Sequence, residues 1–217
     1  MNVELISWPW MDEEALCGLA AAECTGAKDH GKALEAALRS GHMSVLEHAA
    51  FTFLVEGVSR ALLAQITRHR LASFSVRSQR YIDMADMEVA VPESIRADPD
   101  LMDEYADLAE DIRGFYRRAI AAGIPKEDAR YITPQAALTG FVVTMNAREL
   151  RHFFKVRCCN RAQWEIRARA DEMLRLVKKE APALFDGAGP GCVSGECTEA
   201  RPCGHARKEG EWEWQRT

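Results

Sequence analysis

The sequence predicts an α/β fold of the α+β type, in which one central, mostly antiparallel sheet is flanked by helices within a single domain. Three stretches, 3–8, 49–58 and 138–145, have the alternation or the β-branched and aromatic content of strands. Apolar residues over 101–120 recur at the spacing of an amphipathic helix. A chain of 217 residues is long enough to bury one good core.

The first helices are expected between the first two strands. Asp12 can cap a helix, because its carboxylate can accept a hydrogen bond from a free backbone N–H of the first turn. A second helix is expected over 28–38, and Ser40-Gly41 is expected to end it.

The next elements lead towards a strongly basic stretch. Ser44 and Glu47 have the spacing of a capping box, which predicts another helix start. The strand over 49–58 follows. Ser59 is then expected to cap a helix that leads directly into Arg68.

The second half of the chain is expected to be mainly helical. Pro92 opens a connecting turn. The elements expected after it are a helix over 101–120, a short helix after Pro125, the strand over 138–145, a helix capped by Asn146 and a helix that begins at Ala162.

The folded domain is expected to span residues 1–186, followed by a loosely ordered tail, 187–217, rich in cysteine and glycine. Its Cys192, Cys197, Cys203 and His205 are residue types that bind zinc. Their spacing fits the usual zinc-binding pairs poorly, so a structural metal and a flexible, reduced tail both remain open. No metal is expected in the functional site.

The composition favours a soluble, cytoplasmic protein. A net charge of −5 disfavours a surface that coats nucleic acid. No apolar run approaches the roughly 20 residues of a membrane-spanning helix. The N-terminus lacks the features of a signal peptide. The seven cysteines are an odd number and suit a reducing compartment.

The basic segment, Arg68 to Tyr81, carries four arginines, one histidine and three serines without any acid. Guanidinium groups bind phosphate or carboxylate oxygens in pairs, and hydroxyls can complete such a site. If the segment is extended, alternate side chains point in opposite directions, so Arg68 and Arg70 would face one way and His69 the other. A solvated basic loop is the alternative. Ser78 is a poor candidate nucleophile, because no base is evident beside it.

The order of residues in the basic segment resembles the signature of the flavin-dependent thymidylate synthases. The resemblance covers about residues 1 to 186. It rests on four motifs: Gly41-His42 with Ser44 to His48, Arg68 to Tyr81, Thr144 to Arg148, and Arg157 with Gln163 to Arg167.

The resemblance implies an enzyme, a methyltransferase that converts dUMP to dTMP. Methylenetetrahydrofolate would supply the methylene group, and FAD reduced by NADPH would supply the hydride. The family resemblance also implies a homotetramer whose active sites lie where subunits meet.

The family's functional residues map onto matching positions of this chain. FAD would contact His42, Ser44, Glu47, Arg68, His69, Arg70, Arg157, Arg161 and the backbone of Val76. dUMP would be held by Gln65, Arg68, Ser78, Gln79, Arg80 and Arg167. Arg167 would be the catalytic residue. Its fixed guanidinium would favour loss of the uracil N3 proton and so activate C5 without an enzyme nucleophile.

The chain departs from the family pattern at Ser75, Val76 and Gly140. A rival reading is an RNA- or nucleotide-binding module without redox chemistry. The acidic net charge and the few aromatic residues of the basic segment, Phe74 and Tyr81, count against it.

Overall fold

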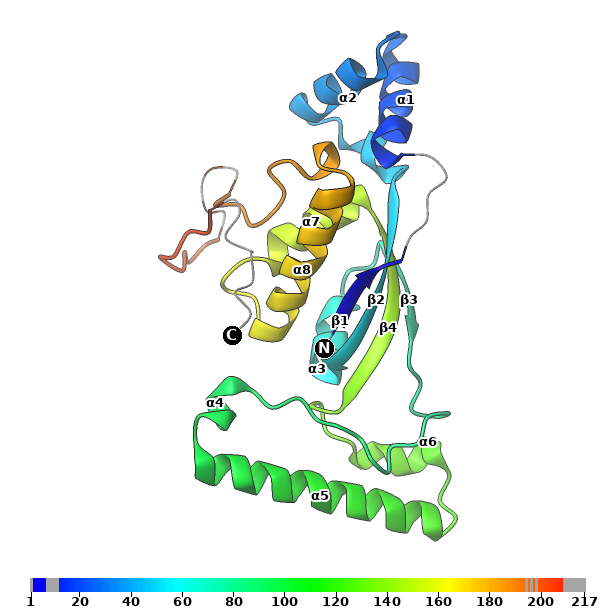
Figure 1. Cartoon of the computed structure of the whole chain (residues 1–217), viewed down its shortest axis with the longest axis vertical. Helices are drawn as coiled ribbons and strands as arrows, with labels where there is room; N and C mark the ends of the chain where they lie inside the picture. The colour runs from blue at the N-terminus through cyan, green and yellow to red at the C-terminus, as the bar shows by residue number, and fades with distance from the viewer. Residues whose placement is uncertain (1, 7–11, 194, 196, 198, 209–217) are drawn as a thin grey trace. The chain divides into compact units, whose positions relative to one another are not determined.

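The structure is a computed structural model and describes residues 2–6, 12–193, 195, 197 and 199–208 (Figure 1). Four strands form one antiparallel sheet in the order β1-β2-β4-β3. The strands are β1 (Asn2–Leu5), β2 (Ala50–Ser59), β3 (Ala72–Val76) and β4 (Leu138–Asn146). The predicted fold class, an antiparallel sheet flanked by helices, is confirmed. The extent of the predicted catalytic domain stays a prediction.

The helices fall largely where the sequence predicts them. They are α1 (Glu13–Thr25), α2 (His30–Arg39), α3 (Arg60–Ile66), α4 (Glu93–Arg96), α5 (Pro99–Ala121), α6 (Lys126–Ala129), α7 (Ala147–Arg157) and α8 (Trp164–Glu180). Three short 3-10 helices accompany them: η1 (Met43–Glu47), η2 (Arg130–Ile132) and η3 (Ala183–Phe185). Within the described part of the chain, every helix is too short or too polar to cross a membrane.

The three predicted N-terminal caps all form. Asp12, Ser59 and Asn146 each accept a hydrogen bond from a backbone N–H two or three residues further on, at 2.7, 3.0 and 2.9 Å respectively. Each bond satisfies a donor that the first turn of a helix leaves without a partner. The caps on Ser59 and Asn146 matter most for function, because they fix where α3 and α7 begin.

Two predicted helix starts differ from the structure. The capping box of Ser44 and Glu47 does not form an α-helix: η1 is a short 3-10 helix without a side-chain cap. The Glu47 carboxylate instead pairs with the Arg148 guanidinium, a partner far away in the sequence. Helix α8 begins at Trp164 rather than at Ala162, because the Gln163 side chain caps it.

The strand that the sequence analysis missed is β3. It lies within the basic segment, at the edge of the sheet beside β4. Its residues, Ala-Ser-Phe-Ser-Val, are all partly or fully exposed, so they lack the alternation of buried apolar and exposed polar residues that marks a strand in a sequence. The sheet therefore extends into the segment that carries the predicted ligands.

The chain divides into two compact units, and each has its own core. One comprises residues 56–65 and 75–141, and its core packs the ring of Tyr116 among methionine and alanine side chains. The other comprises residues 2–55, 66–74 and the chain from 142 onward. In this second unit the rings of Phe51, Phe154 and Phe185 pack edge to face, with centroids 5.3 and 6.0 Å apart.

Tyr116 allows a test of the first core. Its side chain is fully buried, and within the described structure its hydroxyl has no hydrogen-bond partner. Because a buried hydroxyl without a partner costs free energy, we expect Tyr116→Phe to raise the free energy of unfolding by about 1 kcal/mol in urea denaturation. Tyr131→Phe is the control, since Tyr131 is 85% exposed and should show no change. A destabilised Tyr116→Phe variant would contradict this account.

Candidate functional site

The basic segment begins with three residues whose side chains alternate, as predicted. His69 is buried, with 6% of its surface exposed, whereas Arg68 and Arg70 are exposed. Within the described residues, neither of these two guanidinium groups has an ion-pair or hydrogen-bond partner. Two neighbouring cations are therefore left available to an anionic ligand.

His69 is held from both sides by residues of α7. Its Nδ1 lies 3.0 Å from Glu149 Oε1, and Arg157 Nε lies 3.1 Å from its Nε2. A guanidinium nitrogen can only donate, so Nε2 accepts this hydrogen bond. The imidazole is therefore neutral, and its Nδ1–H donates to the Glu149 carboxylate. The predicted contact of His69 with FAD would have to avoid both ring nitrogens, because both are occupied within the protein.

Burial lowers the pKa of the His69 imidazole, and the neighbouring Arg157 cation acts in the same direction, although Glu149 opposes it. The donor atoms of His69, Glu149 and His152 lie within 4.8 Å of one another, which is close enough for metal ligands. However, Nδ1 carries a proton and Nε2 faces the Arg157 cation. These three residues are therefore not a metal site. Instead His69, Glu149 and Arg157 form a hydrogen-bonded unit, the His69 clamp.

Other predicted contacts with FAD lie in the same compact unit as the clamp. His42, Ser44 and Glu47 are exposed on or beside η1. Arg157 is partly buried and is engaged by His69. Val76, at the end of β3, belongs to the other unit and is 36% exposed.

The predicted catalytic residue, Arg167, lies in the first turn of α8 and is partly buried. Its Nη1 donates to the backbone carbonyl of Asn160 at 2.9 Å, which fixes the guanidinium against the turn between α7 and α8. Arg161, in that turn, donates to the carbonyl of Arg201 and lies 3.6 Å from the Glu199 carboxylate. The described tail therefore holds Arg161, a contact that the sequence analysis did not anticipate.

Most of the residues predicted to hold dUMP belong to the other compact unit. Gln79 is buried and donates to the hydroxyl of Thr133 at 3.3 Å. Arg80 Nε lies 2.9 Å from Glu127 Oε2, and both side chains are about half exposed. Ser78 accepts a hydrogen bond from the backbone N–H of Arg80, and Gln65 is partly buried on α3. To bind a phosphate, Arg80 would have to exchange its carboxylate partner for the ligand.

Sequence reasoning missed Glu149 and Arg148 as supporting residues. Glu149 is buried at the start of α7, where a carboxylate is also favoured by the helix dipole. Arg148 pairs with Glu47, one of the predicted FAD contacts. Glu149 could have been noticed, because it lies three residues after the cap Asn146. Its partner, His69, lies 80 positions earlier and could not be predicted from local spacing.

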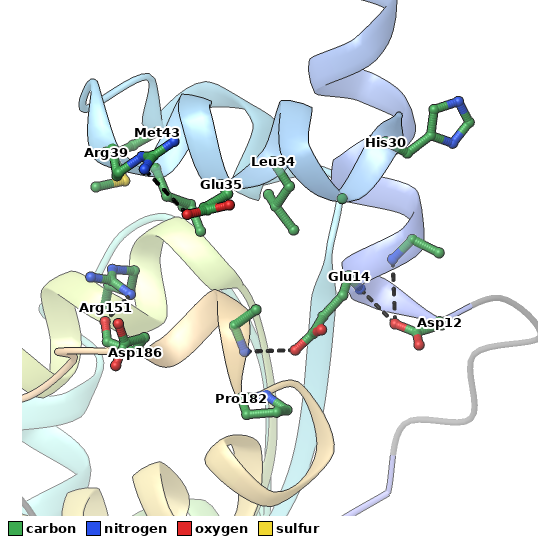
Figure 2. Close-up of a pocket in the computed structure, with 14 residues that line it drawn as sticks. Asp12, Glu14, His30, Leu34, Glu35, Arg39, Met43, Arg151, Pro182 and Asp186 are labelled. Carbon is green, nitrogen blue, oxygen red and sulfur yellow. Dashed lines mark hydrogen bonds and ion pairs between the residues drawn. The ribbon is translucent and has the colours of Figure 1, made fainter. Parts of the chain in front are cut away.

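A large cavity of about 1010 Å³ lies elsewhere in the second unit, between α1, α2 and the segment that contains η3 (Figure 2). None of the predicted site residues lines it. Its polar groups are largely engaged within the chain: Glu14 accepts from the backbone N–H of Ala183 at 2.7 Å, and Arg151 donates to the carbonyls of Leu184 and Asp186. The cavity therefore offers a ligand few unsatisfied polar groups.

The His69 clamp predicts a specific pH dependence. Because the folded state lowers the pKa of His69, the unfolded chain takes up this proton first as the pH falls below the ordinary value of about 6.5. Stability is therefore lost as the pH falls. Between about pH 7 and pH 5.5 we expect melting temperatures to decrease more steeply for the wild type than for His69→Gln. His30→Gln is the control, since His30 is exposed, and equal slopes for all three proteins would contradict the assignment.

Comparison with known proteins supports the sequence resemblance. The family model of the thymidylate synthase complementing protein matches residues 4–183. A relative from Geobacter sulfurreducens, named flavin-dependent thymidylate synthase, is 46% identical over 210 residues, covering 90% of each chain. A relative of the same name from Clostridium tetani is 43% identical over 192 residues, covering 81% of this chain and 77% of its own.

A third relative, from the archaeon Pyrococcus furiosus, bears the same name. It is 43% identical over 180 residues, which cover 79% of this chain and 74% of its own. The match therefore spans most of both proteins rather than a shared motif alone. On this evidence the chain is an enzyme, and it belongs to the family of the thymidylate synthase complementing protein.

Proposed function

We propose that this chain is a flavin-dependent thymidylate synthase that converts dUMP to dTMP. Methylenetetrahydrofolate donates the carbon, NADPH supplies the reducing equivalents through FAD, and tetrahydrofolate is released. The names of its relatives support the general activity. The observation that carries the proposal in this chain is the pair of exposed guanidinium groups, Arg68 and Arg70, without partners among the described residues.

The donor set fits FAD in charge and in exposure. The other two arginines of the basic segment are paired with acids: Arg77 with Glu56 and Arg80 with Glu127. Arg68 and Arg70 have no acidic partner among the described residues, although the chain has 33 acidic residues against 28 basic ones. Such cations suit the diphosphate of FAD or the anionic ring of its reduced form. When bound, FAD would supply the hydride of the reaction.

The protein's own residues would bind and orient the reactants. The clamp of Glu149, His69 and Arg157 keeps the start of the basic segment fixed, so that Arg68 and Arg70 need little ordering when a ligand binds. Arg80 would release Glu127 in favour of the dUMP phosphate. Arg167, held by the carbonyl of Asn160, would stabilise the uracil ring as its N3 proton leaves.

The assembly proposed for this enzyme is a cytoplasmic homotetramer with active sites where subunits meet. Leu101, Leu108 and Phe115 of α5 support subunit contacts. They lie seven residues apart on one helical face and are 49%, 55% and 48% exposed. Apolar side chains gathered in this way commonly mark a protein interface. Sedimentation equilibrium measures the assembly directly, and a monomer at working concentrations would refute it.

The visible absorption spectrum of the purified chain tests the function. We expect a flavin spectrum that dUMP perturbs, because Arg68 is a proposed contact of both ligands. Formation of dTMP from dUMP should require both methylenetetrahydrofolate and NADPH. A protein that takes up no FAD and gives no response to dUMP would overturn the proposal.

Arg167→Ala tests the proposed catalytic residue. We expect dTMP formation to fall by at least about 100-fold, which is the typical cost of removing one preorganised donor from a developing anion, while FAD stays bound. Arg175→Ala is a matched control, because Arg175 is an exposed arginine on the same helix. Turnover of Arg167→Ala at the wild-type rate would exclude the activation role.

A further inference from the structure

The described tail gathers cysteines around a second, smaller cavity. Cys159, Cys192, Cys197 and Cys203 all line this space of about 200 Å³, although they come from two distant parts of the chain. The other three cysteines lie outside it. All seven are free thiols rather than disulfides. Four sulfur ligands around one cavity match the number that a structural zinc site uses.

Two of these sulfur atoms accept backbone hydrogen bonds. The N–H of His205 lies 3.4 Å from Cys203 Sγ, and the N–H of Arg207 lies 3.3 Å from Cys192 Sγ. Gly204, with φ of 76°, makes the tight turn that brings the His205 amide back onto the sulfur. Such donors stabilise a thiolate, the form of cysteine that binds metal, and orient it.

Ordered contacts hold the tail beside Cys159. Asn160 Nδ2 donates to the carbonyl of His205 at 2.9 Å. Arg207 donates to the carbonyl of Cys158 at 2.7 Å and to the Asp171 carboxylate at 2.9 and 3.0 Å. The side chains of this ion pair are only 11% and 8% exposed. These contacts differ from the expectation of a loosely ordered tail, and they explain why distant cysteines converge.

We propose that Cys159, Cys192, Cys197 and Cys203 bind a structural zinc ion in tetrahedral coordination. The sequence spacing of the tail cysteines fits known zinc motifs poorly because the tail supplies three ligands, and the fourth comes from the turn after α7. On binding, each thiol loses its proton to water, and each sulfur donates an electron pair to the metal. Soft thiolate ligands select zinc over magnesium or calcium.

The cavity also carries charges that suit this site. A zinc ion with four thiolates has a net charge of about −2. Two cations, Arg161 and Arg207, line the cavity, together with one carboxylate, Glu199, which lies 3.6 Å from Arg161. Among the described residues, no three of the sulfur atoms yet lie within 4.8 Å of one another. At least two of the four side chains must therefore move when zinc binds.

The site would fasten the tail to the turn between α7 and α8. That turn contains Asn160, whose carbonyl holds Arg167, and Arg161, which contacts the tail. The role is structural, and the inference does not depend on the proposed reaction. Metal content can therefore confirm or refute it whatever the outcome of the dTMP assay.

Metal analysis of the full chain, purified without chelator, tests the proposal. We expect about one zinc ion per chain, and loss of most of it in Cys203→Ser and in Cys192→Ser. Cys24→Ser is the matched control, since Cys24 is exposed and lies outside the cavity. His205→Ala should also keep its zinc, because the backbone of His205, not its ring, contacts the site.

A measurement on the wild type guards against variants that fail to fold. Cobalt added to the chelator-treated chain should give the visible absorption bands of tetrahedral thiolate coordination, and zinc should displace them. Chain that holds no zinc and binds neither metal would overturn the proposal. So would iron with acid-labile sulfide, which would indicate a cluster, or a disulfide between these cysteines in protein prepared under reducing conditions.

Discussion

The hydrogen bond between His69 and Glu149 is the interaction on which the candidate site depends. It buries one residue of the basic segment against α7, while Arg68 and Arg70 on either side of that residue are exposed. Arg157 completes the arrangement by donating to the other ring nitrogen. A buried imidazole with both ring nitrogens hydrogen-bonded has one favourable orientation. The backbone of Arg68 and Arg70, on either side of it, is therefore fixed before any ligand binds.

The distribution of paired and unpaired charges separates structural from functional arginines. Arg113 and Arg117 pair with acids on or near α5, and Arg207 pairs with a buried carboxylate of α8. The charges of these arginines are neutralised by acids within the fold. Within the part of the chain that the structure describes, Arg68 and Arg70 have no such partner, and two neighbouring like charges are unfavourable unless an anion offsets them. These two neighbouring cations therefore mark the part of the chain where an anionic ligand is expected to bind.

Local rules predicted the parts of the structure that local forces determine. The caps on Asp12, Ser59 and Asn146 need only a side chain and an amide two or three residues away, and the sequence reveals both. The capping box at Ser44 and Glu47 failed because Glu47 has a stronger, charged partner 101 positions later. The strand β3 was missed because an exposed edge strand needs no apolar alternation.

The same distinction applies to the candidate site. An extended segment would make the side chains of Arg68, His69 and Arg70 alternate, and their exposure does alternate. The backbone is nevertheless not extended there: Arg68 lies in a turn, in which the N–H of His69 donates to the carbonyl of Ile66 at 3.0 Å. The identity of the clamp was not predictable, since Glu149 and Arg157 lie 80 and 88 positions away from His69. The contacts that hold the described part of the tail were hidden in the same way. Its composition resembles that of a loose segment, but one buried ion pair at Arg207 outweighs composition.

That ion pair also constrains how the chain acquires its structure during synthesis. Asp171 leaves the ribosome 36 residues before Arg207, the cation that accompanies it into the interior. Burial alone raises the pKa of the Asp171 carboxyl, so packing it without Arg207 is unfavourable. Helix α8 is therefore expected to stay exposed to solvent until the tail has left the ribosome. The helix that carries Arg167 would be among the last parts of the enzyme to reach its final packing.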